Sequence, residues 1–180
     1  YFLNGYPSLA QFVASDRDKS TAVFRRFDRL SARNLLYLQS ELAELETKQD
    51  AFDRADGLDD LHTKQCARNW EHLRERARTG AKETERVQLA LEIRAKLKEY
   101  REALLFENTL LSLDPPSQRV LQALRKKFHN VTPGDPEGWP TLGGASSSIY
   151  EDGTDLIALR RPPHQDRMTA FVRERLGIFF

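Results

Sequence analysis

Cysteine is almost missing from the sequence, and long apolar runs are missing altogether. The single cysteine, Cys66, cannot form a disulfide within the 180-residue chain, which excludes a cystine-stapled secreted scaffold and a zinc site built from several cysteines. No apolar run approaches the roughly 18 residues that cross a bilayer, and no charged-then-apolar leader begins the chain. We therefore expect this chain to be soluble and to work in a reducing, intracellular compartment.

An excess of charge of one sign is also missing. The chain has 28 Lys and Arg residues against 27 Asp and Glu residues, so it lacks the basic signature of a dedicated nucleic-acid binder. Its 39% hydrophobic and 31% charged residues indicate a large solvated surface, as in long helices with one apolar stripe. We expect no nucleic-acid partner.

Proline is absent between Pro7 and Pro115, and glycine occurs there only at Gly57 and Gly80, which predicts helix. Apolar residues recur every three, four, seven or eight positions from residue 20 to 52, a pattern typical of a long helix with coiled-coil character. An aspartate-rich turn around Gly57 separates it from a second helix over residues 61–113, which Gly80 bends without ending.

Folding these helices back about Gly57 predicts an antiparallel hairpin over residues 20–113. Residues 41–60 are mainly acidic and residues 64–82 mainly basic, so this direction apposes opposite charges. In that register Leu45 lies near Trp70 and Leu73, Leu30 near Val87, and Phe27 near Ala90 and Leu91. The predicted hairpin core is Phe24, Phe27, Leu35, Leu38, Leu42, Leu45, Trp70, Leu73, Val87, Leu91, Ile93, Leu97 and Leu104.

The second helix is longer than the first, so its end, residues 97–111, needs other partners. Residues 1–19, 114–128 and 162–180 provide candidate elements of a small bundle. Residues 129–161 are rich in proline and glycine and predict a long irregular loop, in which residues 156–159 form a short strand or turn. The predicted fold is one all-α domain: a long antiparallel, coiled-coil-like hairpin joined to a small helical bundle, with the loop before the last helix.

No combination of residues indicates catalysis. His62 and Cys66 have the spacing of two metal ligands on a helix, but a zinc site needs three or four. The serines at 146–148 follow two glycines without the Gly-Lys-Ser/Thr signature of a phosphate-binding loop, and no nucleophile elbow is present. We expect no enzyme activity, no cofactor, no metal and no small-molecule substrate; an enzyme would have only the loop over residues 143–155 for its site.

Basic side chains cluster near both ends of the chain. One cluster lies between residues 17 and 33, and the other precedes the apolar carboxyl end, an arrangement that suits an anionic membrane surface. An ordinary solvated helix face explains these charges as well. The candidate membrane contacts are Arg160, Arg161, Arg167, Arg173 and Arg175.

Several long runs resemble a family of uncharacterised fungal proteins that share domain of unknown function 6594. The runs are residues 6–16, 24–46, 90–105, 110–116 and 143–159. The resemblance implies a helical, cytosol-facing part that is followed, in typical members, by transmembrane helices near the carboxyl end. It brings no established catalytic residues.

Together these observations predict a non-enzymatic helical interaction or scaffold domain at the cytosolic face of a membrane. Its hairpin binds a protein partner or self-associates, and it has a possible contact with an anionic membrane surface. The alternative is a membrane-active fungal effector of the self-recognition or cell-death type, which the basic ends and the apolar terminus motivate.

Overall fold

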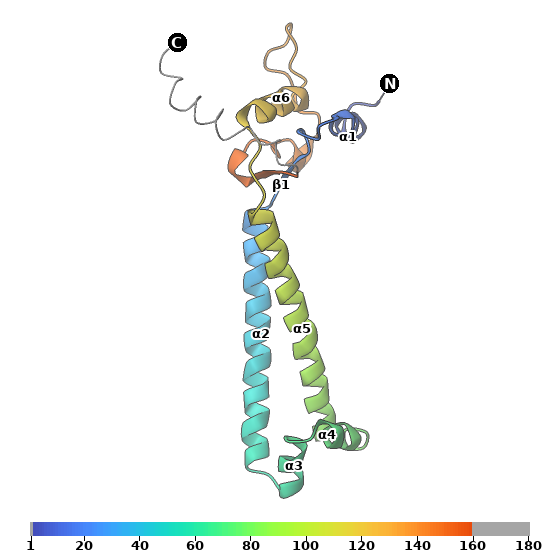
Figure 1. The fold of residues 1–180 in the computed structure, drawn as a ribbon, viewed down its shortest axis with the longest axis vertical. Coiled ribbons are helices and arrows are strands. Elements are labelled where there is room, and N and C mark those ends of the chain that lie inside the picture. Colours follow the sequence, from blue (N-terminus) through green and yellow to red (C-terminus); the bar gives the residue numbers. More distant parts are fainter. Residues whose placement is uncertain (1, 160–180) are drawn as a thin grey trace, which may run out of the picture. The chain divides into compact units, whose positions relative to one another are not determined.

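A computed structural model of the chain describes residues 2–159 and divides it into two compact units. Among the described residues, the head unit comprises residues 2–28 and 109–159, and the hairpin unit comprises residues 29–108. Helices dominate the described residues, as predicted, and the all-α class is confirmed. In chain order (Figure 1) the elements are α1 (Tyr6–Ser15), β1 (Val23–Arg25), α2 (Asp28–Gly57), α3 (Leu61–Cys66), α4 (Trp70–Arg76), α5 (Ala81–Leu111), α6 (Gln118–Phe128) and β2 (Leu156–Ala158), with short 3-10 turns at Gly144–Ser146 and Gly153–Asp155.

The core of the head unit forms around α6. Ser117 caps this helix by accepting a hydrogen bond from the amide of Val120, and its apolar face is buried. Phe128 meets the Tyr150 ring edge to face at 5.1 Å between centroids. The buried cluster consists of Leu9, Val23, Leu121, Leu124, Phe128, Leu142, Tyr150, Leu156 and Ala158.

Part of the predicted irregular loop is hydrogen-bonded to the end of α6. The amide of Trp139 donates to the carbonyl of His129 at 2.6 Å, and the amide of Thr141 donates to that of Phe128 at 2.7 Å. Gly138 has φ +62°, and a side chain there would collide with the His129 carbonyl, so only glycine fits. The third predicted bundle element, residues 162–180, lies outside the described residues.

The first hairpin helix begins later than predicted. Residues 23–25 form strand β1, antiparallel to β2 with Phe24 opposite Ile157, and α2 begins only at Asp28. Val23 and Phe24 favour an extended backbone, and Phe27 at φ +60° interrupts any helix. The prediction that Phe24 and Phe27 belong to the hairpin core is therefore wrong, because both are exposed residues of the head unit.

The second helix is also shorter than predicted, because the chain turns twice before α5. Helix α3 ends at Cys66, and the side chain of Asn69 accepts from the amide of His72 at 3.1 Å to start a new helix, α4. Helix α4 ends before Gly80, a poor helix former. The hydroxyl of Thr84 then donates to the Ala77 carbonyl at 2.6 Å, which satisfies one of the groups that the end of α4 exposes.

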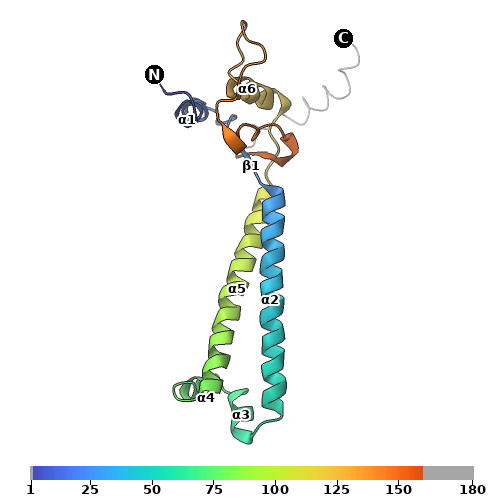
Figure 2. The ribbon, with the colours of Figure 1, turned by 180° about the vertical axis from the view of Figure 1, so that it is seen from behind.

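Helices α2 and α5 lie side by side in both views (Figures 1 and 2). They contain 30 and 31 residues, so the start of α2 covers the end of α5 and the predicted uncovered segment does not exist. Lys96 pairs with Glu41 at 2.6 Å, and Gln39 donates to Tyr100 at 2.9 Å.

The predicted hairpin register is therefore wrong. Residues 58–80 form the turn and its two short helices. A given residue of α2 therefore lies beside a residue of α5 that is more than twenty positions further along the chain than a tight turn at Gly57 predicts. The seam between the two long helices includes buried Leu38 and Leu45 on α2 and buried Leu89 on α5.

Candidate functional site

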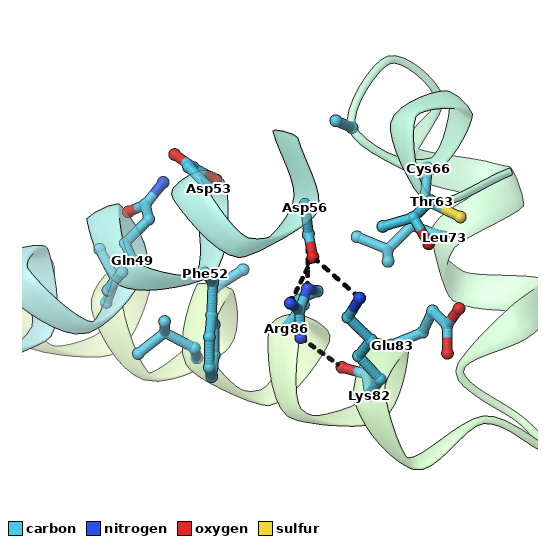
Figure 3. Close-up of a pocket in the computed structure, with 14 residues that line it drawn as sticks. Gln49, Phe52, Asp53, Asp56, Thr63, Cys66, Leu73, Lys82, Glu83 and Arg86 are labelled. Atoms are coloured by element: carbon cyan, nitrogen blue, oxygen red, sulfur yellow. Dashed lines mark hydrogen bonds and ion pairs between the residues drawn. The ribbon is translucent and has the colours of Figure 1, made fainter. Parts of the chain in front are cut away.

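The end of the hairpin is fixed by an ion pair between its two long helices (Figure 3). Asp56 on α2 accepts two hydrogen bonds from the Arg86 guanidinium on α5, one of them from Nε at 2.6 Å. The same guanidinium lies over the Phe52 ring, 4.4 Å from its centroid, and donates to the Lys82 carbonyl at 3.1 Å. Because a bidentate pair has one favoured geometry, this contact sets the register of α5 on α2.

Lys82 extends the ion pair to the turn. Its ammonium bonds to Asp59 and lies 3.4 Å from Asp56. The hydrogen bond from Arg86 lowers the pKa of Asp56, and the bond from Lys82 lowers that of Asp59. The same bond to Asp59 raises the pKa of Lys82. All these groups are therefore charged at neutral pH.

The lowered carboxyl pKa values predict that acid weakens the hairpin unit. A group whose pKa is lower in the folded than in the unfolded state stabilises the fold above its unfolded pKa, and that stability disappears as pH falls through the folded pKa. We expect the urea midpoint to hold steady near neutrality and to fall below about pH 4. Circular dichroism measures it. In Asp56→Asn we expect a lower urea midpoint at neutral pH and a smaller decrease of that midpoint on acidification. If the midpoint of the variant decreased as steeply as that of the unmodified chain, the Asp56 carboxylate would not be the cause.

A cavity of about 150 Å³ lies beside this cluster. Thr63, Cys66 and Leu73 line it from the turn, and Glu83 from α5 (Figure 3). Glu83 is buried and pairs with Arg76 at 3.3 Å. Cys66 is a buried free thiol, while His62 is exposed. Within residues 2–159 no three His, Cys, Asp or Glu side chains gather in a way that would hold a metal ion.

A second feature lies along the middle of the hairpin, where exposed basic residues follow α5. Arg94, Lys98 and Arg101 border a shallow groove whose floor is half-buried Ala90, Ile93 and Leu97. Positions spaced by four and then three residues stay on one side of a helix. Leu91 and Leu105 continue the same spacing on either side and are 47% and 66% exposed.

Acidic residues follow α2 with the same spacing. Glu46, Asp50 and Asp53 are exposed. The ion pair between Glu41 on α2 and Lys96 on α5 marks one edge of the hairpin. A helix turns about 100° per residue, so each charged triplet lies roughly 120° to 200° around its helix from the member of that ion pair, which is the opposite edge. The two triplets therefore share one edge. We call it the charged edge: Ala43, Glu46, Asp50, Asp53 and Gly57 of α2, with Leu91, Arg94, Lys98, Arg101 and Leu105 of α5.

The predicted core residues do not gather in one place. Leu38 and Leu45 are buried in the seam, whereas Trp70, Leu91 and Leu104 are exposed. The candidate membrane contacts, Arg160, Arg161, Arg167, Arg173 and Arg175, lie outside the described residues. The half-buried members of the predicted core are Leu35, Leu42, Leu73, Val87, Ile93 and Leu97.

Sequence reasoning missed both the ion-pair cluster and the charged edge. It took the acids of residues 41–60 as one block that faces its own chain. One signal in the sequence distinguishes charges on the exposed side of a helix from charges that pair within the hairpin. It is the spacing of four and then three residues, which occurs in Glu46, Asp50 and Asp53 and again in Arg94, Lys98 and Arg101.

The described residues thus define an α-helical protein with a two-helix hairpin unit and a small mixed head unit. Within residues 2–159 no helix combines the length and the apolarity that crossing a bilayer requires. The chain belongs to a family of unknown function, DUF6594, whose family model matches residues 6–180. No curated protein and no solved structure matches the chain.

Proposed function

We propose that this chain is a non-enzymatic interaction domain whose hairpin binds protein through the charged edge. The observation that carries the proposal is the layout of that edge: charged residues in the middle of the α5 stripe, and the exposed leucines Leu91 and Leu105 at its two ends. Leucines and charges at heptad-like spacing are what helices use to recognise other helices.

The energetics support a protein partner for this edge. Covering one exposed leucine stabilises a complex by about 1.5–3 kcal/mol, and the charges add orientation more than affinity. The cavity beside Asp56 lacks comparable support for catalysis, since Asp56, Lys82, Glu83 and Arg86 are all paired with one another or with Arg76 and Asp59. Turnover of a generic ester, phosphate or peptide substrate that Glu83→Gln abolished would contradict a non-enzymatic role.

We also propose that this domain works at the cytosolic face of a membrane. The support is the family resemblance, which implies transmembrane helices near the carboxyl end of typical members. The alternative function, a membrane-active effector, depends on arginines outside the described residues. Release of dye from anionic vesicles by the purified chain would favour that alternative over an interaction domain.

Site-specific photo-crosslinking tests the proposed function. We expect a benzophenone amino acid at Leu105, on the charged edge, to give a covalent adduct of discrete mass in cells that produce the protein. The same group at Glu92, which is also exposed on α5 but faces the opposite edge, should give none. Equal labelling from both positions, or none from either, would overturn the proposed binding edge.

A further inference from the structure

We infer that the head unit binds a fatty acid in an apolar groove beside α1. The groove has a volume of about 470 Å³, and all of its lining residues belong to the head unit. Of the ten lining residues only Lys19 is charged. The inference goes beyond the proposed function and is independent of it, because no residue of the charged edge lines this groove.

The walls of the groove leave large apolar side chains uncovered. Tyr6 and Phe24 line it and are 69% and 47% exposed. Leu9, Leu142 and Tyr150 line it as well and belong to the buried core of the unit, so the groove lies against a packed support. A concave site of a few hundred Å³ with apolar walls and few polar groups is typical of small-molecule binding.

The shape of the groove suits an alkyl chain. Its lining residues on α1 form one stripe along the helix, from Tyr6 through Leu9, Ala10 and Val13 to Ala14. At 1.5 Å per residue this stripe is about 12 Å long, which is the length of a medium-chain fatty acid. An extended peptide would bring backbone N–H and C=O groups that apolar walls cannot pair, whereas an alkyl chain brings none.

Lys19 supplies the positive charge that a carboxylate headgroup requires. It follows the end of α1, and its ammonium donates to the Ala14 carbonyl at 2.6 Å. An ammonium has three N–H donors, so two are left for a ligand. The neighbouring carboxylate, Asp16, accepts from the hydroxyls of Ser20 and Thr21, both at 2.9 Å. The headgroup is therefore expected beside Lys19, at the Ala14 end of the stripe.

Isothermal titration calorimetry of the full chain with decanoate, which stays monomeric in dilute solution, tests the site. We expect one bound decanoate per chain. Its affinity should fall about tenfold in Lys19→Met, because a hydrogen bond to a charged group is lost, and should be retained in Lys19→Arg. Decyltrimethylammonium has the same chain and the opposite charge, so it should bind at least about tenfold more weakly. Equal binding of the two amphiphiles would overturn the inference.

A matched pair of tryptophan substitutions tests the position of the site. Ala10 and Gln11 are neighbouring exposed residues of α1, and only Ala10 lines the groove. Ala10→Trp fills the groove and should abolish decanoate binding, whereas Gln11→Trp should leave it unchanged. Circular dichroism during urea unfolding checks that both variants are folded.

Two results would overturn the fatty-acid site. One is decanoate binding that Ala10→Trp leaves intact, because the ligand would then lie elsewhere. The other is an unmodified chain that binds no decanoate. If Ala10→Trp then also lowered the urea midpoint more than Gln11→Trp does, a segment of the chain itself would be the occupant of the groove.

Discussion

Leu38→Asp is expected to unfold the hairpin unit, whereas Leu36→Asp, two positions away on the same helix, is expected to change little. Leu38 is 3% exposed in the seam between α2 and α5, and Leu36 is 61% exposed. Removing a buried leucine side chain costs about 2–5 kcal/mol, and a carboxylate in that seam adds the cost of a buried charge that has no partner. That sum approaches the whole stability of an ordinary domain.

Urea unfolding followed by the fluorescence of Trp70, with Trp139 replaced by Phe, measures this difference in the hairpin unit. The free energy of unfolding should fall by more than about 4 kcal/mol for Leu38→Asp and by no more than about 0.5 kcal/mol for the exposed Leu36→Asp. Similar losses in both variants would mean that Leu36 also lies in a core, which contradicts the assignment of α2 faces.

The sequence allowed the helical class and the antiparallel pairing of two long helices to be predicted, because a proline-free stretch with one apolar period has few other solutions. It did not allow the register to be predicted. The register depends on where the return helix begins, and that depends on two local caps: Asp60, which accepts from the amide of Thr63 at 2.8 Å, and Asn69 at the start of α4. Each contributes about 1 kcal/mol, too little to stand out from the periodicity of residues 61–113.

The start of α2 was mispredicted for a related reason. Phe24 and Phe27 fit the helical period, but a residue far along the chain decides their conformation. Asp155 accepts from Arg25 Nε at 2.6 Å and from the amide of Asp28 at 3.0 Å, and β2 pairs with β1. These contacts between distant segments fix the strand and the first residue of α2, and a pattern read within a local window contains no trace of them.

Helix α2 carries two separate stripes, one in the seam and one on the charged edge. On α2 the seam positions Leu38 and Leu45 are seven residues apart, and on the charged edge Glu46 and Asp53 repeat the same interval. Two stripes of one period on one helix are typical of helices that contact one neighbour inside their own chain and another outside it. The inner stripe is apolar and carries the stability, while the outer stripe is mainly charged and, in the proposed function, selects the partner.

Phe128→Ala is expected to cause the largest loss of stability in the head unit. Phe128 is fully buried at the end of α6, its ring packs edge to face against Tyr150, and the chain after it is hydrogen-bonded back to its own carbonyl through Thr141 at 2.7 Å. Truncating a buried phenylalanine costs about 3–5 kcal/mol because the cavity collapses only in part.

Trp139 provides the readout, since it lies in the loop that is fastened to the end of α6, and replacing Trp70 with Phe removes the signal of the hairpin unit. We expect the Trp139 transition to move to lower urea in Phe128→Ala and to stay in place in Phe24→Ala, which removes an exposed phenylalanine of the same unit. Both variants lose one phenylalanine, so a difference between them reports the effect of burial. If Phe24→Ala were the more damaging change, β1 rather than α6 would hold the centre of the head core.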